Sequence, residues 1–194
     1  MGAEIGTGRL VVVSGPSRGG KSRWAEHLAA QDGRPVLYVA TGRPASADDD
    51  PSWQARVEAH RHRRPGGWHG IEPGAELELA LEERLHPGHA QADHLLLIDS
   101  LGSWLAWHLD KDGPQWQQRC ERLITALCHS GPPVLVVVEE TGWGVVPPTA
   151  IGGLFRDRLG ALHQELMRHC GAAWLVIGGR AVDLLAISQP VPAP

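Results

Sequence analysis

The sequence has no apolar run long enough to cross a bilayer, and we expect no targeting signal at its start. Uninterrupted apolar runs, such as residues 95–98 and 134–138, fall far short of the ~20 residues that a membrane-spanning helix needs. No charged start precedes an apolar segment, so we expect no signal peptide. The opening MGAEIG has glycine where N-myristoylation needs serine or threonine, which argues against a lipid anchor.

Cysteine and positive charge are also scarce. The three cysteines, Cys120, Cys128 and Cys170, are odd in number and show no CxxC spacing. This pattern argues against a disulfide framework and a structural zinc site, and it predicts a reducing, cytoplasmic location. Lysine and arginine total 18 against 22 aspartates and glutamates, for a formal net charge of −4. Without a basic stripe, neither nucleic acid nor an anionic membrane is an expected partner.

The pattern of apolar residues predicts one α/β domain that spans residues 1–194, with residues 1–8 and 189–194 as frayed tails. Short apolar, β-branched runs predict buried strands at residues 10–13, 36–40, 94–98, 133–138 and 173–177. Amphipathic segments predict helices at residues 22–31, 53–64, 75–85, 101–109, 115–129 and 154–169. This alternation is typical of a mostly parallel sheet with helices on both faces.

The sharpest local signal is the segment GPSRGGKS, which fits G-x-x-x-x-G-K-[ST] between a predicted strand and a predicted helix. Backbone N–H groups at such a helix N-terminus bind phosphates, and the Lys21 ammonium adds charge at the β- and γ-phosphates. The Ser22 hydroxyl is placed to bind Mg²⁺. The alternative is a glycine-rich turn that matches by chance. The predicted nucleotide-binding residues of this loop are Gly15, Pro16, Ser17, Arg18, Gly19, Gly20, Lys21 and Ser22.

Carboxylates end two of the predicted strands. Asp99 ends HLLLID and is the candidate metal ligand, because P-loop enzymes hold Mg²⁺ with a strand-end aspartate. The alternative for Asp99 is an N-cap of the next helix, a position that Ser100 could take instead. Glu139 and Glu140 follow the strand at residues 133–138, at the sheet edge where ligands bind. We predict a guanine or metal contact for Glu140, with a solvated pair of carboxylates as the alternative.

Basic residues cluster in the segment ARVEAHRHRRP. If this segment is helical, Arg56, His60 and either Arg63 or Arg64 lie on one face. The phosphates of a nucleotide would make this clustering of positive charge favourable; the alternative is an exposed basic helix face without a ligand. Neighbouring cations also favour a neutral, nucleophilic ring at His60. His62 lies on another face and is expected to be solvated.

Taken in order, these motifs resemble those of the bifunctional adenosylcobinamide kinase / adenosylcobinamide-phosphate guanylyltransferase family of cobalamin biosynthesis. The likeness extends from about residue 10 to about residue 178. It rests on the segments SGPSRGGKSRWAE, VLYVAT, ARVEAHRHRRP, LLLIDSLGSWL, VVEETGWGVVP and FRDRLGALHQELM. The sequence departs from the family pattern at Glu139 and His163, where asparagine is usual, and at Thr141, where valine is usual.

The resemblance implies a P-loop NTPase with a RecA-like sheet and two activities on a corrinoid. Such enzymes phosphorylate the aminopropanol hydroxyl of adenosylcobinamide with ATP or GTP. They then transfer GMP from GTP onto the new phosphate, through a guanylyl–histidine, to give adenosylcobinamide-GDP. The matching histidine here is His60, which with Lys21 forms the predicted catalytic pair. Ser22 and Asp99 are the predicted Mg²⁺ ligands, and the resemblance also implies a homotrimer.

Two other functions stay open on the sequence alone. One is a kinase that keeps the P-loop but has lost the guanylyl transfer. The other is a RecA-like ATPase that acts as a motor or regulator. The second would need a surface for nucleic acid or a protein partner, and this acidic chain offers little for one.

Overall fold

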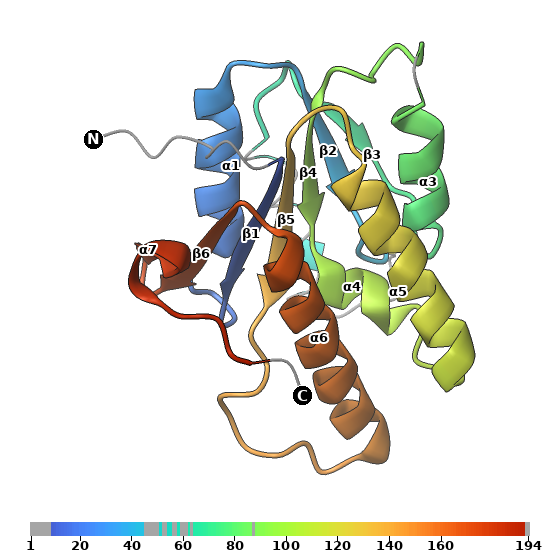
Figure 1. Ribbon diagram of the computed structural model, residues 1–194, viewed down its shortest axis with the longest axis vertical. Coiled ribbons are helices and arrows are strands. Elements are labelled where there is room, and N and C mark those ends of the chain that lie inside the picture. Colours follow the sequence, from blue (N-terminus) through green and yellow to red (C-terminus); the bar gives the residue numbers. More distant parts are fainter. Residues whose placement is uncertain are drawn as a thin grey trace.

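A seven-stranded sheet runs through the middle of the protein, in the order β3-β2-β4-β5-β1-β6-β7 (Figure 1). The computed structural model describes residues 9–44, 51, 54, 55, 58, 62, 64–86 and 88–192. The strands are β1 (Leu10–Gly15), β2 (Val36–Ala40), β3 (His69–Ile71), β4 (Leu95–Asp99), β5 (Val134–Glu139), β6 (Ala172–Ile177) and β7 (Arg180–Asp183). Neighbouring strands pair in parallel, except that β7 runs antiparallel to β6.

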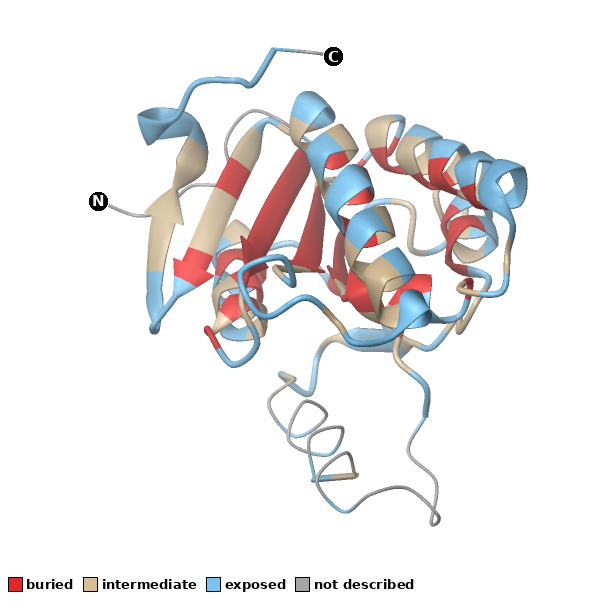
Figure 2. Ribbon diagram, turned by 90° about the horizontal axis from the view of Figure 1, so that it is seen from below, coloured by how far each residue is buried: buried red, intermediate tan, exposed pale blue. Residues whose placement is uncertain are grey.

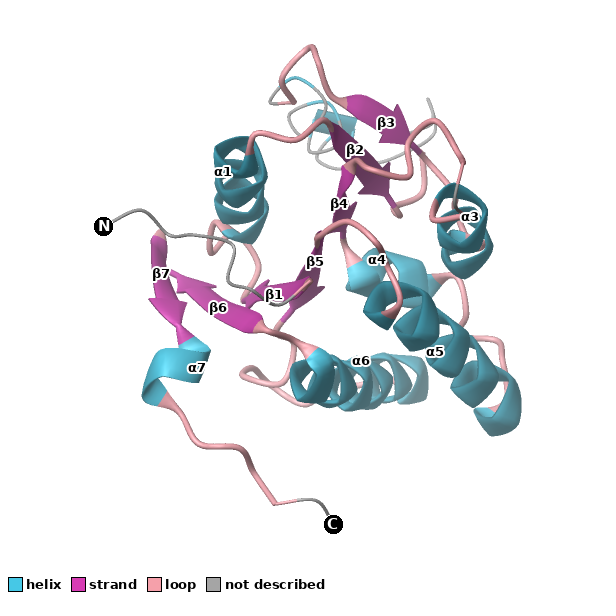
Figure 3. Cartoon of the chain, turned by 45° about the horizontal axis from the view of Figure 1, so that its top comes forward, coloured by secondary structure: helices cyan, strands magenta, loops and turns pink. Residues whose placement is uncertain are grey.

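Helices cover both faces of the sheet (Figure 3). Helix α1 (Lys21–Asp32) lies on one face, and α3 (Leu77–Arg84), α4 (Leu101–Ala106), α5 (Gly113–Cys128) and α6 (Ala150–His169) lie on the other. The short α7 (Leu184–Ile187) follows the edge strand β7. The predicted α/β class is therefore confirmed. Strand β5 separates the P-loop strand β1 from β4, which ends in Asp99, and this is the RecA-like order that was expected.

The sheet separates two apolar clusters, because successive side chains of a strand point to opposite faces. Val11 of β1 packs in the cluster with Leu28 of α1. Val12, the next residue, packs in the other cluster with Leu105 of α4 and Leu162 of α6. Figure 2 shows the buried residues concentrated on the central strands and on the sides of the helices that face them. The two clusters fix α1 and α4, whose N-termini both lie at the carboxyl edge of the sheet.

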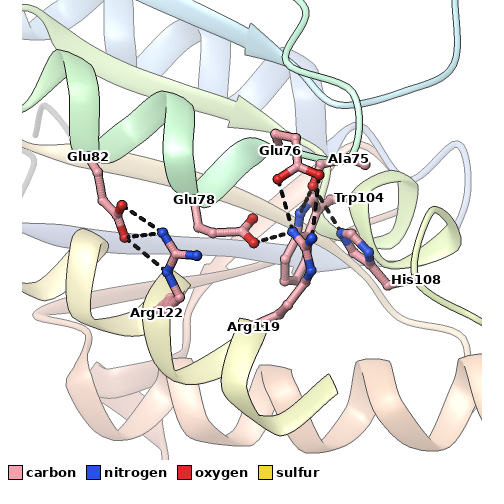
Figure 4. A network of polar contacts seen from close by, with 8 residues as sticks. All are labelled: Ala75, Glu76, Glu78, Glu82, Trp104, His108, Arg119 and Arg122. Carbon is pink, nitrogen blue, oxygen red and sulfur yellow. Dashed lines mark hydrogen bonds and ion pairs between the residues drawn. The ribbon is translucent and has the colours of Figure 1, made fainter. Parts of the chain in front are cut away.

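A polar network joins α3, α4 and α5 on one face of the sheet (Figure 4). The fully buried Glu78 of α3 accepts a hydrogen bond from Arg119 of α5. Trp104 Nε1 and His108 Nε2 both donate to the carbonyl oxygen of Ala75, at 3.2 and 3.0 Å. Burial lowers the pKa of His108, which keeps its ring neutral. These contacts hold α4 in place beside the sheet.

The predicted strands are confirmed. Three of them extend one or two residues past their predicted ends, to Gly15, Asp99 and Glu139. The sequence pattern missed two edge strands. Strand β3 has three residues, two of them exposed, so it shows no apolar run. Strand β7 follows a two-residue turn at Gly178 and Gly179, with φ of 59° and 76°, the conformation that a tight hairpin requires. A sequence signal for β7 was available in the pair Gly178-Gly179, which follows the strand predicted at residues 173–177.

Helix boundaries differ from the prediction at a few ends. The helix expected at residues 101–109 ends at Ala106. The helix expected at residues 154–169 begins at Ala150, because Thr149 accepts a hydrogen bond from the backbone N–H of Gly152 at 3.2 Å and caps it. The helix expected at residues 53–64 lies mostly outside the described residues. Among the helices that the structure describes, none combines the length and apolar character that crossing a membrane requires.

Candidate active site

The P-loop wraps between the end of β1 and the start of α1, as predicted. Gly15 and Gly20 adopt φ of 149° and 108°, a region that favours glycine. A side chain at Gly15 or Gly19 would run into the carbonyl oxygen of Val176 in β6, closer than van der Waals contact allows. The loop therefore needs glycine there, where it lies against β6. Lys21 is buried, and its Nζ donates to the carbonyl oxygen of Pro16 at 2.9 Å.

Parallel pairing brings the ends of four strands to one edge of the sheet. Gly15 of β1 lies beside Glu139 of β5, and Ala40 of β2 lies beside Asp99 of β4. A pocket of about 110 Å³ opens at this edge. Its lining unites four predicted site residues, Lys21, Ser22, Arg64 and Asp99, and adds Tyr38, Arg43 and Glu139. The structure thus assembles cations, a hydroxyl and carboxylates at the N-terminus of α1.

Asp99 is held by a buried tyrosine. Tyr38 Oη donates to Asp99 Oδ2 at 2.7 Å. Burial and the neighbouring Asp99 carboxylate raise the pKa of Tyr38 far above its usual value, so the phenol stays a hydrogen-bond donor. The Arg64 guanidinium carbon lies 3.9 Å from the centre of the Tyr38 ring, a cation–π contact. Ser100, and not Asp99, takes the N-cap position of α4, so Asp99 is directed to the pocket.

The two strand-end glutamates have different contacts. Glu139 accepts hydrogen bonds from Ser100 Oγ and, at 2.9 Å, from the backbone N–H of Gly102. It therefore caps the N-terminus of α4 from the neighbouring strand. Glu140 Oε1 instead lies 2.9 Å from His163 Nδ1. Glu140 also lines a second pocket, together with Ser17 of the P-loop. Neither carboxylate is merely a solvated surface group.

The basic segment is placed only in part. Arg56, His60 and Arg63 lie outside the described residues, so their roles stay predictions. Arg64 lines the pocket, as predicted. The His62 side chain is 73% exposed, and its Nδ1 lies 3.0 Å from Glu58 Oε1, in agreement with the solvated position expected for it.

Sequence reasoning did not select Tyr38, Thr41 or Arg43. Thr41 Oγ1 accepts from the backbone N–H of Ser100 at 3.0 Å and so joins the end of β2 to the end of β4. A usable signal was present, since all three residues lie in or directly after a buried strand that ends at the ligand-binding edge. Tyr38 is also the only tyrosine in the chain.

Comparison with known proteins identifies relatives over nearly the whole chain. A bifunctional adenosylcobalamin biosynthesis protein, CobP, of Pseudomonas aeruginosa is 33% identical over 174 residues, which cover 89% of this chain and 95% of that protein. The bifunctional adenosylcobalamin biosynthesis protein CobU of Escherichia coli is 31% identical over 189 residues, covering 90% of this chain and 99% of that protein. The CobU protein of Salmonella typhimurium is 30% identical with the same coverage.

Among solved structures, the RadB recombinase is similar at 15% identity with a TM-score of 0.47, over 86% of this chain and 73% of that chain. A KaiC-like protein from Pyrococcus horikoshii is similar at 15% identity with a TM-score of 0.48, over 86% and 70% of the two chains. The family model described as cobinamide kinase / cobinamide phosphate guanyltransferase matches residues 11–184. With this match and the relatives above, the chain belongs to the cobinamide kinase / cobinamide phosphate guanyltransferase family.

Proposed function

We infer that the chain carries both activities of its family. It phosphorylates adenosylcobinamide with ATP or GTP, and it transfers GMP from GTP to adenosylcobinamide phosphate to give adenosylcobinamide-GDP. The observation that supports this most strongly is the pocket in which the P-loop residues Lys21 and Ser22 meet Asp99 and Arg64. Such a pocket suits the phosphates of a nucleoside triphosphate, and the family assignment supplies the corrinoid acceptor.

In the kinase step, the P-loop backbone and Lys21 hold the β- and γ-phosphates while the acceptor hydroxyl attacks the γ-phosphorus. Phosphoryl transfer depends almost entirely on positioning and on stabilising charge. Lys21 is already at the floor of the pocket, held by the carbonyl oxygen of Pro16. When a triphosphate binds, the Lys21 ammonium can donate to the charged phosphate oxygens in place of the neutral carbonyl oxygen of Pro16. Hydrogen bonds between charged groups are stronger than those between neutral groups.

In the guanylyl transfer, a ring nitrogen of His60 attacks the α-phosphorus of GTP and pyrophosphate leaves. The phosphate of adenosylcobinamide phosphate then attacks the guanylyl–histidine and releases His60. Splitting the transfer into two displacements lets one nucleotide site serve two acceptors. Arg64 lines the nucleotide pocket and stabilises the charge that develops. Arg56 and Arg63 are proposed to do the same from the segment that carries His60.

Mg²⁺ is proposed as the metal, with Ser22 and Asp99 as its protein ligands. Both residues line the pocket, and a hydroxyl with a carboxylate is the oxygen donor set that Mg²⁺ prefers beside substrate phosphates. When bound, it neutralises charge on the β- and γ-phosphates. In the part of the chain that the structure describes, no group of three His, Cys, Asp or Glu side chains could hold a metal. This fits a site that is completed by the nucleotide.

We expect Tyr38→Phe to raise the Mg²⁺ concentration that gives half-maximal activity by about 10-fold, since losing a group that orients a metal ligand typically costs 10–100-fold. The variant removes the hydrogen bond from Tyr38 Oη to Asp99 and keeps the ring under Arg64. A Mg²⁺ titration of initial rates measures the shift. The control is Ser130→Ala, which also removes a buried hydroxyl. An equal shift in both variants would argue against this role for Tyr38.

We propose that the protein is located in the cytoplasm. All three cysteines carry free thiols, which supports a reducing cytoplasm.

A homo-oligomer, a trimer by family resemblance, is proposed. Large apolar side chains are exposed in and after the loop that precedes α6, among them Trp143, Val145 and Ile151, and such a patch suits contact between subunits. No nucleic-acid partner is proposed.

The test of the proposed function is incubation with adenosylcobinamide, Mg²⁺ and GTP, followed by mass analysis of the corrinoid. We expect adenosylcobinamide phosphate first and adenosylcobinamide-GDP after it. If the reaction stops at adenosylcobinamide phosphate, the chain is a kinase that has lost guanylyl transfer. If nucleotide is hydrolysed and the corrinoid is unchanged, the RecA-like ATPase alternative holds instead.

A further inference from the structure

A second pocket of about 610 Å³ adjoins the nucleotide pocket. Gly42, Arg43, Ser103 and Glu139 line both pockets, and Ser17 of the P-loop lines the second. The two pockets therefore lie side by side at the carboxyl edge of the sheet. A cavity of this size takes a drug-sized group.

The lining of the second pocket differs in chemistry from that of the first. Trp107 and Phe155 provide an aromatic wall, and Glu139 and Glu140 provide carboxylates. Arg43 is the basic residue in this lining, whereas Lys21, Arg43 and Arg64 all line the nucleotide pocket. The nucleotide pocket sets Lys21, Arg43 and Arg64 against the carboxylates of Glu72, Asp99 and Glu139. The second pocket sets two carboxylates against one cation, so it attracts phosphates less strongly. The second pocket suits an uncharged group with an apolar part and a hydroxyl.

Glu140 is fixed in this pocket from two sides. Its backbone N–H donates to the carbonyl oxygen of Gly15, the first residue of the P-loop motif, at 2.9 Å. Its Oε1 lies 2.9 Å from His163 Nδ1, within ion-pair distance, and the side chains of Glu140 and His163 are only 21% and 15% exposed. Glu139 is committed to capping α4. Of the two carboxylates that line the second pocket, Glu140 is therefore the one that caps no helix, and it follows the strand beside the phosphate loop.

We propose that the second pocket holds the hydroxyl-bearing arm of the acceptor, and that Glu140 is the base of the kinase step, with His163 as its positioning residue. This inference rests on the proposed function. The acceptor oxygen bonds to the γ-phosphorus while the bond from phosphorus to the β–γ bridging oxygen breaks. The nucleoside diphosphate leaves with that electron pair, and the hydroxyl proton passes to Glu140 Oε2. His163 keeps Oε1 engaged and so directs Oε2 to the acceptor.

Glu140→Gln tests the catalytic role. We expect kcat for phosphorylation to fall by at least about 100-fold, within the range that a general base contributes, with little change in the KM for the corrinoid. Transfer of GMP to supplied adenosylcobinamide phosphate persists, because that acceptor has no hydroxyl proton to lose. Glu140→Asp, which keeps the carboxylate, restores part of kcat. The matched control is Glu165→Gln, because Glu165 pairs with His169 on the same helix at 3.2 Å and lies outside this lining.

His163 and the pocket wall give two further readouts. The Nδ1 of histidine and the Nδ2 of asparagine are both bonded to Cγ, so His163→Asn keeps an N–H donor for Glu140. We expect His163→Asn to retain kcat and His163→Leu to lower it by about 10-fold, as for other lost orienting groups. Ala106 is exposed and lines the pocket. Ala106→Phe fills the pocket and raises the KM for the corrinoid, without changing guanylylation of the protein by GTP.

The outcomes separate this inference from the proposed function. If the wild-type protein makes no adenosylcobinamide phosphate, the proposed function itself fails. If it does, and Glu140→Gln keeps phosphorylation within about threefold of wild type, Glu140 is not the base. If Glu140→Gln lowers guanylylation of the protein as much as phosphorylation, Glu140 contacts the nucleotide and the pocket assignment is overturned. Equal kcat in His163→Asn and His163→Leu would remove the positioning role.

Discussion

Replacing Lys21 by alanine is expected to abolish both phosphorylation of adenosylcobinamide and formation of the guanylylated protein. The Lys21 ammonium is the buried cation at the N-terminus of α1, beside Ser22 in the nucleotide pocket. A triphosphate bound there loses its main contact to the β- and γ-phosphates. Removing one such group that stabilises developing charge typically costs about 100- to 1,000-fold in rate. The two activities fall together because the proposal places both reactions on one bound triphosphate.

The two reactions of the Lys21→Ala protein are measured separately, by corrinoid mass analysis and by protein-bound label from [α-³²P]GTP. Lys111→Ala is the matched control, because Lys111 is the other lysine of the chain and is paired with Asp110 at 2.9 Å. Wild-type rates are expected for this control. Either activity at near the wild-type rate in Lys21→Ala would contradict a single phosphate site for both reactions.

The second large effect is expected from His60→Ala. Loss of the nucleophile should lower guanylyl transfer by at least about 1,000-fold, as for other enzymes that lose the group forming the covalent intermediate. Phosphorylation of adenosylcobinamide should stay near the wild-type rate, because a hydroxyl that attacks the γ-phosphorus needs no histidine intermediate. The experiment compares the two products after incubation with GTP. Loss of both products would indicate that His60 contributes to nucleotide binding and not to covalent catalysis.

His62→Ala is the matched control, because it removes the histidine two residues after His60. His62 is exposed, and its imidazole pairs with Glu58, so guanylyl transfer should continue in the variant. A phosphoramidate bond is labile in acid and stable in alkali, unlike a serine phosphoester. Label from [α-³²P]GTP should therefore be lost in acid and survive base in wild type and in His62→Ala.

The sequence predicted the centre of the fold well, because the buried strands show as uninterrupted apolar runs. The P-loop and Asp99 followed from the same runs, since each comes at the end of one. Parallel strands bring such ends to one edge, and Lys21, Ser22 and Asp99 do meet in one pocket. The edge strands β3 and β7 were missed because exposed edges carry no such run.

The contacts between side chains from distant segments could not be predicted. Nothing in the sequence joins Tyr38 to Asp99, or Glu139 to the N-terminus of α4, because both contacts depend on strand order. The pairing of Glu140 with His163 likewise requires α6 to lie against the end of β5. The strands alone do not specify that packing. These tertiary contacts decide which carboxylate serves the nucleotide pocket, which caps a helix and which faces the second pocket.

The central claim is that one P-loop site forms a covalent guanylyl–histidine at His60, and the most direct measurement is to locate the guanylyl group in the chain. After incubation with GTP, trypsin cleavage at arginine separates residues 57–61, which contain His60 as their only histidine, from residues 62–63, which contain His62. Mass spectrometry at alkaline pH should find the GMP adduct on residues 57–61. An adduct confined to any other peptide, or no adduct while adenosylcobinamide-GDP still forms, would contradict the account.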